Sequence, residues 1–244
     1  GYDHAFKYNP DGMAAGHGKT DFFTFQWNHL LSNKMFYDLK ISQTKNYSGS
    51  YLFENPLDSN YVHDKYLESF GPGFFTGGQQ KHHDTRTIDN FNVKFDFNWQ
   101  INNSHNLKTG LNFKKYDIDN SWRQIRNEYF GTPLEGQLYK PKVFGDSTLF
   151  ADVYTAQPQE FSAYIQDKME FQDMVINFGL RYDNFDTKSK SPSNRRNPAN
   201  QLSLPDSMMS SQLPVDPQIQ ISPRFGLAYQ LGSAAVLHFS YGHF

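Results

Sequence analysis

The sequence predicts an all-β fold, a transmembrane antiparallel up-and-down β-barrel of which about eight strands are visible. Three observations predict it. Apolar and polar residues alternate along eight segments, and short connections between these segments alternate with long ones. Aromatic residues make up 17% of the 244 residues, although the mean hydropathy is only −0.72. A polar average with many aromatics is typical of a barrel with a wet lumen and an apolar lipid face.

The composition excludes several other classes of protein. The net charge is −2 and no basic stripe is present, so nucleic acid is not an expected partner. The chain has no cysteine, which excludes a disulfide framework and a cysteine nucleophile. No run approaches the roughly 18 apolar residues of a membrane helix, whereas a barrel strand needs only about 9–11 residues with every second one apolar. No signal peptide is visible, and we expect the chain to be a section of a longer precursor.

Each of the eight segments places its apolar residues at every second position. The third is the strictest, with six apolar residues against five polar ones between Phe91 and Ile101. Such a pattern fits a strand and not a helix. In the fifth segment Asp167 interrupts the apolar set. In chain order the apolar sets are Phe23, Phe25 and Trp27; Met35, Tyr37, Leu39 and Ile41; Phe91, Val93, Phe95, Phe97, Trp99 and Ile101; Leu107, Leu111 and Phe113; Phe161, Ala163, Ile165 and Met169; Ile176, Phe178, Leu180 and Tyr182; Ile221, Pro223, Phe225, Leu227, Tyr229 and Leu231; and Leu237, Phe239 and Tyr241.

The connections follow a rhythm. Short ones lie near 31–34, 102–106, 172–174 and 232–234, and they are rich in the Asn, Ser, Gly and Asp that turns favour. Long ones are predicted at 44–90, 117–158 and 186–220, and 1–19 is predicted as the end of another. Outer-membrane barrels have short periplasmic turns and long outer loops. The alternative is a soluble β-sandwich, whose strands also alternate but whose connections mix lengths.

The two faces of these strands predict two environments. The apolar face would contact lipid. Trp27, Trp99 and Tyr229 lie near the short turns, and Tyr116 and Tyr182 lie near the long loops, a placement that fits two aromatic girdles. The polar face would line the lumen, where its charges would pair with one another or meet water or a plug. These predicted lumen-facing residues are Asp38, Lys40, Lys94, Asp96, Arg181, Asp183 and Arg224.

Four phrases in the second half of the chain form a recognisable series. They are Phe161–Lys168 (FSAYIQDK), Val175–Asp183 (VINFGLRYD), Ile221–Tyr229 (ISPRFGLAY) and Val236–Phe244 (VLHFSYGHF). As a set they resemble the barrel of TonB-dependent outer-membrane receptors, particularly the large ones of Bacteroidota-like bacteria. Residues 1–160 match by rhythm alone. The resemblance implies a 22-stranded barrel in the Gram-negative outer membrane, an N-terminal plug inside it, and energy from the TonB complex.

Neither a plug nor a TonB box is seen in this sequence, so no energy-coupling residue is assigned. A complete eight-stranded barrel is the alternative. Such a barrel commonly ends on an aromatic residue in the apolar register, whereas Phe244 falls in the polar register of Gly242, Ser240 and His238. We therefore expect residues 1–244 to be one section of a single larger barrel domain.

The predicted outer loops are rich in aromatic and arginine side chains. Such clusters suit a polar ligand with apolar faces, such as a siderophore, a glycan or a peptide. They would equally serve as the small cores that long loops need to stay folded. The candidate ligand-binding residues are Tyr51, Tyr66, Phe74, Phe75, Trp122, Arg123, Arg126 and Tyr129.

No catalytic constellation, metal site or cofactor site is predicted. His82 and His83 lie near His63 and Asp84 in the sequence, but adjacent histidines rarely ligate one ion. No nucleophile elbow is present. The function predicted is a receptor that imports an extracellular ligand, with the lipid bilayer, its own plug and the TonB complex as partners. The alternatives are a passive porin-like channel, or an adhesin or enzyme that uses the long loops.

Overall fold

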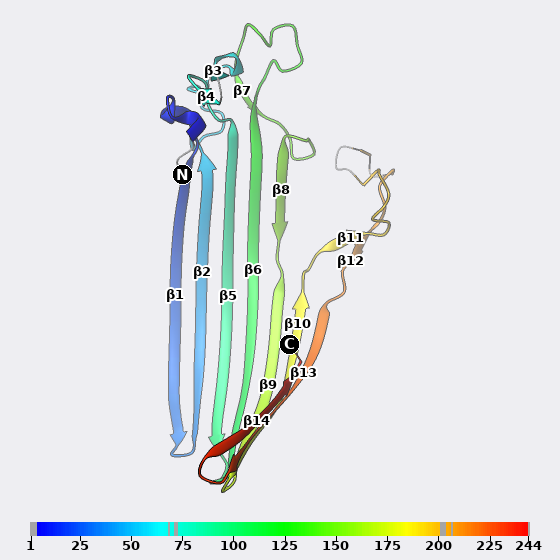
Figure 1. Cartoon of the computed structure of the whole chain (residues 1–244). Coiled ribbons are helices and arrows are strands. Elements are labelled where there is room, and N and C mark those ends of the chain that lie inside the picture. The colour runs from blue at the N-terminus through cyan, green and yellow to red at the C-terminus, as the bar shows by residue number, and fades with distance from the viewer. Residues whose placement is uncertain (1–3, 68, 71–72, 201–203, 206, 244) are drawn as a thin grey trace.

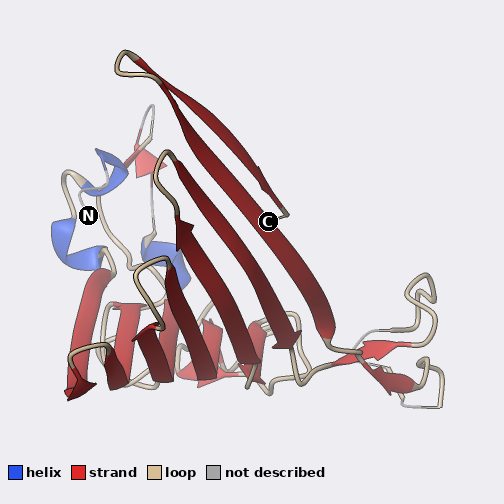
Figure 2. Ribbon diagram, turned by 90° about the horizontal axis from the view of Figure 1, so that it is seen from below, coloured by secondary structure: helices blue, strands red, loops and turns tan. Residues whose placement is uncertain are grey.

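The computed structural model describes residues 4–243 except 68, 71–72, 201–203 and 206. It is dominated by one long antiparallel sheet in the order β1-β2-β5-β6-β9-β10-β13-β14, in which each strand pairs with the next along the chain (Figure 1). The sheet is strongly curved when it is seen along its strands (Figure 2). The strands of this path are β1 (Ala15–Ser32), β2 (Met35–Tyr51), β5 (His82–Gln100), β6 (His105–Asn127), β9 (Gln159–Glu170), β10 (Met174–Asp186), β13 (Gln218–Leu231) and β14 (Ala235–Gly242).

This architecture confirms the predicted all-β, up-and-down class. Each of the eight alternating segments lies in one strand of this path, except that Ile101 falls just after the end of β5. The four short connections are tight turns at one end of the sheet, which we call the turn end. The long connections leave from the other end, the loop end. No helix among the described residues is long and apolar enough to cross a membrane.

The seven charged residues predicted to face the lumen share one face of the sheet, the polar face. Asp38 stands opposite Asp96, and Lys40 opposite Lys94. The row of Asp96 continues through Gly110 and Tyr164 to Arg181. The remaining two are placed by the alternation of side chains along a strand. Asp183 and Gly179 each lie two residues from Arg181 and therefore share its face. Arg224 of β13 is in register with Gly179.

The opposite, apolar face carries large side chains that nothing in the described chain covers. Phe23 is 66% exposed, Ile165 51% and Phe239 55%. A soluble monomer rarely leaves a continuous apolar surface of this extent in water. We call this band the apolar belt; on β5 it runs from Phe91 to Trp99 at alternate positions, with the in-register residues of the neighbouring strands. Its place on one face is what lipid contact requires.

The predicted loop boundaries were wrong because the strands continue beyond the apolar belt. The predicted loop 44–90 gives eight residues to β2 and nine to β5. There the apolar face becomes polar, with Asp21, Lys45, Asp89 and Asp117 in register. The alternation of apolar and polar residues therefore ends where both faces of the sheet contact water, although the backbone hydrogen bonds between the strands continue. At about 3.3 Å per residue, residues 82–90 extend β5 by roughly 30 Å.

The other predicted loops change in the same way. Within 1–19, β1 already begins at Ala15, and within 117–158, β6 runs to Asn127. β8 (Ala151–Ala156) pairs with β6 in the register that β9 continues, so β8 and β9 act as one strand interrupted at 157–158. In 186–220, β11 (Lys190–Pro192) and β12 (Gln212–Pro214) form a small ribbon. Residues 1–3 and Phe244, with the register argument built on it, lie outside the described residues.

One contact on the polar face joins three strands. Tyr164 of β9 donates a hydrogen bond to Asp96 Oδ1 of β5 at 2.8 Å, across β6. Gly110 of β6 lies between them, and a Cβ at Gly110 would come within 2.4 Å of Tyr164 Cε1. Lys94 Nζ lies 2.6 Å from the other carboxylate oxygen of Asp96. The missing side chain at Gly110 is what lets the Tyr164 ring reach Asp96.

Candidate functional site

The extended ends of β5 and β6 form one wall of a hollow at the loop end. Its volume is about 670 Å³. Asp84 and Trp122 stand directly opposite each other in the β5–β6 register, and both lie at the alternate positions that continue the polar face. We call this site the upper hollow; its lining residues are Phe6, Asp64, Leu67, Phe75, Gln79, Gln80, Lys81, His82, Asp84, Trp122 and Gln124.

The N-terminal segment closes one side of the upper hollow. Phe6 of the 3₁₀ turn η1 (His4–Phe6) is buried and packs against Phe75 of β4 (Phe74–Phe75), with ring centroids 4.8 Å apart. The backbone N–H of Ala14 donates to Gln80 Oε1 at 2.8 Å. Asn9 Nδ2 donates to the carbonyl of Gly78 at 2.8 Å. The segment before β1 and the segment before β5 therefore hold each other in place.

A small core of loop residues supports the other side. The ammonium group of Lys81 lies 2.7 Å from Asp64 Oδ1 and 4.0 Å from the centre of the Tyr139 ring, and the Lys81 side chain is only 8% exposed. Burial lowers the pKa of Lys81, and the hydrogen bond to Asp64 opposes that shift. Burial also raises the pKa of Tyr139. Nearby Tyr61 is buried. Part of the aromatic content of the loops thus stabilises the loops themselves.

Asn127, the last residue of β6, is the anchor of the loop that follows it. It is 2% exposed. Its Nδ2 donates to the carbonyls of Glu135 (3.2 Å) and Leu138 (2.6 Å). Its Oδ1 accepts from the backbone N–H of Tyr129 (3.3 Å) and Lys140 (3.1 Å). One amide therefore satisfies four backbone groups of residues 129–140.

We expect Asn127→Ala to open this loop without unfolding the sheet. The substitution removes the partner of four backbone groups, and each one that is shielded from water then costs about 1–3 kcal/mol. The backbone ladder of the sheet does not depend on this amide. Hydrogen exchange of residues 128–140 should become at least tenfold faster. Gln137→Ala, an exposed position in the same loop, is the control and should leave exchange unchanged. Equal exchange in both variants would contradict the anchoring role.

The structure brings two of the eight candidate ligand-binding residues, Phe75 and Trp122, together in the upper hollow. Phe74 lies beside them but contacts His4 and Tyr8. Tyr66 is largely exposed on the 3₁₀ turn η3 (Asp64–Tyr66). The backbone N–H of Tyr129 is bound to Asn127.

The other three candidates are engaged outside the upper hollow. Tyr51 is buried and stacked between His17 (4.3 Å) and His83 (4.7 Å) at positions that continue the apolar face. Arg123 forms a salt bridge with Asp146 at 2.7 Å. The Arg126 guanidinium lies over the rings of two phenylalanines.

Sequence reasoning missed Phe6, Asp84, Gln124 and the Lys81–Asp64 pair. Asp84 could have been found by extending the period-2 pattern of β5 backward from Lys94 through the predicted loop. The same pattern separates the adjacent histidines: His82 faces Ser50 Oγ at 3.3 Å, whereas His83 Nε2 contacts the carbonyl of Glu54 on the other face. The role of Phe6 depends on a tertiary contact that no local pattern indicates.

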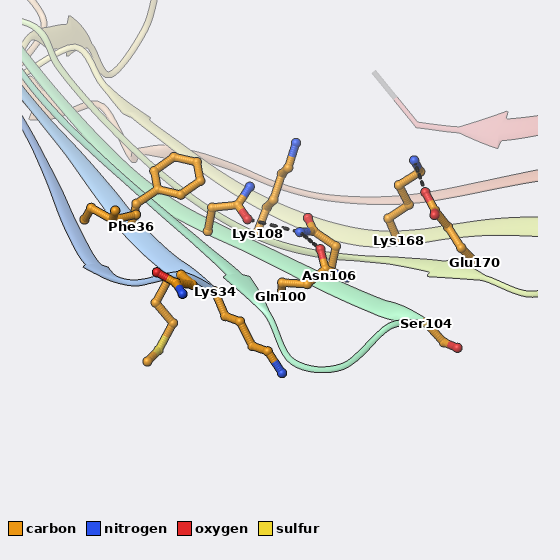
Figure 3. A pocket seen from close by; sticks show the side chains of 12 residues that line it. Lys34, Phe36, Gln100, Ser104, Asn106, Lys108, Lys168 and Glu170 are labelled. Carbon is orange, nitrogen blue, oxygen red and sulfur yellow. Dashed lines mark hydrogen bonds and ion pairs between the residues drawn. The ribbon is translucent and has the colours of Figure 1, made fainter.

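A second hollow of about 510 Å³ lies at the turn end. Figure 3 shows Phe36, Lys108 and Lys168 pointing to the same side of the sheet there. Lys168 is paired with Glu170, and Asn106 donates to Gln100 at 2.7 Å. Amides and lysines therefore make the turn end of the polar face hydrophilic, as a surface against water or another protein domain must be.

The family comparison agrees with this architecture. The family model described as "TonB dependent receptor-like, beta-barrel" matches residues 1–243. Among solved structures the chain is similar to the closed form of the ferric-catecholate import receptor Fiu from E. coli K12, with 11% identity and a TM-score of 0.29. That alignment covers 94% of this chain and 49% of the receptor, so the chain spans about half of its length. No curated protein matches. The chain belongs to the family of TonB-dependent receptor-like β-barrels, which lie in the outer membrane of Gram-negative bacteria.

Proposed function

We propose that this chain forms one wall of an outer-membrane receptor that imports an extracellular ligand, and that the upper hollow is part of the ligand's binding site. The observation that carries the proposal is the place of the hollow. It lies beyond the apolar belt at the loop end, and it continues the polar face that runs down the sheet to the turn end. A ligand bound there would contact the same face that lines the path across the membrane.

The family is one of outer-membrane transporters, and membership supports two further parts of the proposal. A plug domain would contact the polar face, and the TonB complex would supply the energy for uptake. Several charges of the polar face form compensated pairs, such as Lys114 with Glu160 at 3.0 Å and Arg181 with Asp183 at 2.8 Å. A wall with compensated charges suits transient contact with a second domain better than tight retention of an ion.

The test is uptake of labelled probes by cells that make the whole protein, with and without a functional TonB complex. The probes are a ferric catecholate, a ferric hydroxamate, neutral oligosaccharides and oligopeptides. We expect one class to accumulate only when TonB is functional. We expect Trp122→Ala to lower its accumulation at least tenfold, because central tryptophans are frequent energetic hot spots.

The control substitution is Trp27→Ala. Trp27 lies on the apolar face within the belt, with Leu39 of β2 as its register partner. The Trp27→Ala variant should take up as much probe per folded molecule as the unsubstituted protein. Uptake that does not need TonB would indicate a passive channel. Uptake that needs TonB but is unchanged by Trp122→Ala would place the ligand elsewhere in the protein.

A further inference from the structure

The upper hollow offers little net charge to a ligand. The carboxylate of Asp64 is neutralised by Lys81, whose ammonium is buried and lies over the Tyr139 ring. No arginine is among the described residues that line it. A smaller hollow of about 300 Å³ adjoins it, shares Asp84, and adds Arg86 two residues along β5. Among the residues that the structure describes, the joint surface thus balances each carboxylate with one cation. A polyanionic ligand would meet Asp84 there without an excess of positive charge.

The polar groups of this surface are mainly amides and hydroxyls. Gln124 and His82 line the upper hollow, and Ser48, Ser50 and Asn120 line the smaller one. Groups of this kind donate and accept hydrogen bonds at the same time. The Asp84 carboxylate adds hydrogen-bond acceptors, and the Arg86 guanidinium adds N–H donors. The two residues are about 7 Å apart along the same face of β5. Such a mixture matches a ligand that is dense in hydroxyl groups.

Trp122 gives this surface its apolar element. It stands directly opposite Asp84, so their Cβ atoms are separated by only about 4.5–5.5 Å. A pyranose ring presents C–H groups on its face and hydroxyls around its edge. It can therefore stack on the indole while its hydroxyls donate to the carboxylate. A catecholate complex could also stack, but its anionic oxygens would be repelled by Asp84.

An extended peptide is a poorer match for the same surface. Peptides that bind to sheets commonly add a strand to a free edge. β5 is already paired with β2 and β6, and β6 is paired with β5 and β8 along the hollow. The backbone here is occupied, so recognition depends on side chains alone.

We infer that the surface formed by Trp122, Asp84 and Arg86, with the amides and hydroxyls around them, binds a neutral oligosaccharide. This inference rests on the proposed function, because it names the ligand class of the same site. The two adjoining hollows would hold successive sugar units, one on Trp122 and the next between Arg86 and Asn120.

The experiment is tryptophan fluorescence of the whole protein in outer-membrane vesicles, titrated with hexamers of glucose, xylose, mannose and N-acetylglucosamine. A ferric catecholate and an oligopeptide are titrated in parallel. We expect a saturable change with at least one hexamer, and we expect Trp122→Phe to abolish it while Trp27→Phe leaves it intact. Binding should change less than twofold between low and high salt, because a neutral ligand has no charge to screen.

Affinity for that hexamer should fall at least tenfold in Asp84→Asn. It should be unchanged in Asp119→Asn, which alters an exposed carboxylate at a position that continues the apolar face. A Trp122-dependent response to the catecholate or the peptide, with none to any hexamer, would overturn the oligosaccharide inference and leave the proposed function standing. No Trp122-dependent response to any probe would overturn the inference and the placement of the site together.

Discussion

Ile165→Arg is expected to destabilise the folded barrel by about 2–4 kcal/mol, the cost of a basic side chain on the lipid face near the bilayer midplane. Ile165 lies at the centre of the apolar belt of β9, between Thr109 of β6 and Leu180 of β10. It is 51% exposed, so the new side chain would enter lipid. The polar groups nearest to it along the same face are already engaged, because Asp167 is paired with His105 at 2.7 Å and the Thr109 hydroxyl donates to the carbonyl of Tyr164 at 2.8 Å. Unfolding by denaturant of the protein reconstituted in vesicles measures the loss.

Gln26→Arg is the matched control for that substitution. Gln26 is exposed on the polar face of β1, opposite Lys40 of β2. An arginine there would remain in contact with water, and we expect a change within about 0.5 kcal/mol. If both variants lost the same stability, the assignment of the two faces to lipid and lumen would be wrong.

Gly110→Ala is expected to cost about 1–3 kcal/mol, the usual range for an overpacked site. The new methyl group would lie 2.4 Å from Tyr164 Cε1, 2.7 Å from Asp96 Oδ1 and 3.0 Å from the carbonyl oxygen of Phe95. The tyrosine ring can move away, but it then loses its hydrogen bond to Asp96. The backbone carbonyl cannot move without disturbing the β5–β6 ladder. The midpoint of denaturant unfolding should fall accordingly.

Two comparisons isolate the cause of that loss. Gly16→Ala, on the same face of β1, adds a methyl group with no heavy atom within 4 Å and should be nearly neutral. In a Tyr164→Ala background the cost of Gly110→Ala should shrink, because the clash with the ring is gone. An unchanged cost in that background would show that Tyr164 is not what the glycine accommodates.

The fold could be predicted from the sequence to the extent that side-chain chemistry changes from one face of a strand to the other. In Phe91–Ile101 lipid contact on one face and polar surroundings on the other produce strict alternation, and the strand was found. From His82 to Asn90 both faces of the strand are polar, so its residues show no apolar–polar alternation. The sequence alone therefore predicts a loop there. Hydrogen bonds between backbones hold it as a strand all the same.

The candidate site was predictable in kind and only partly in detail. The abundance of aromatics near the loop end indicated a binding surface or a loop core. The structure shows a loop core beside a hollow, and ligand binding in that hollow stays a prediction. Trp122 and Phe75 line the upper hollow, whereas Tyr61 and Tyr139 stabilise the loops. Which aromatic does which depends on strand register. A shift of one residue in β6 would move Trp122 to the other face.

The most direct test of the account is a cysteine scan along β5, from His83 to Trp99, in the whole protein in outer-membrane vesicles. The chain has no cysteine of its own, so each spin label placed in it is unique within the chain. From Phe91 to Trp99, we predict that odd-numbered labels are more accessible to oxygen than to a water-soluble nickel chelate, and that even-numbered labels show no such preference. Between His83 and Asp89 the odd-numbered labels should prefer the chelate. Odd-numbered labels between Phe91 and Trp99 that prefer the chelate would contradict a lipid-facing belt, and with it the membrane-spanning barrel wall.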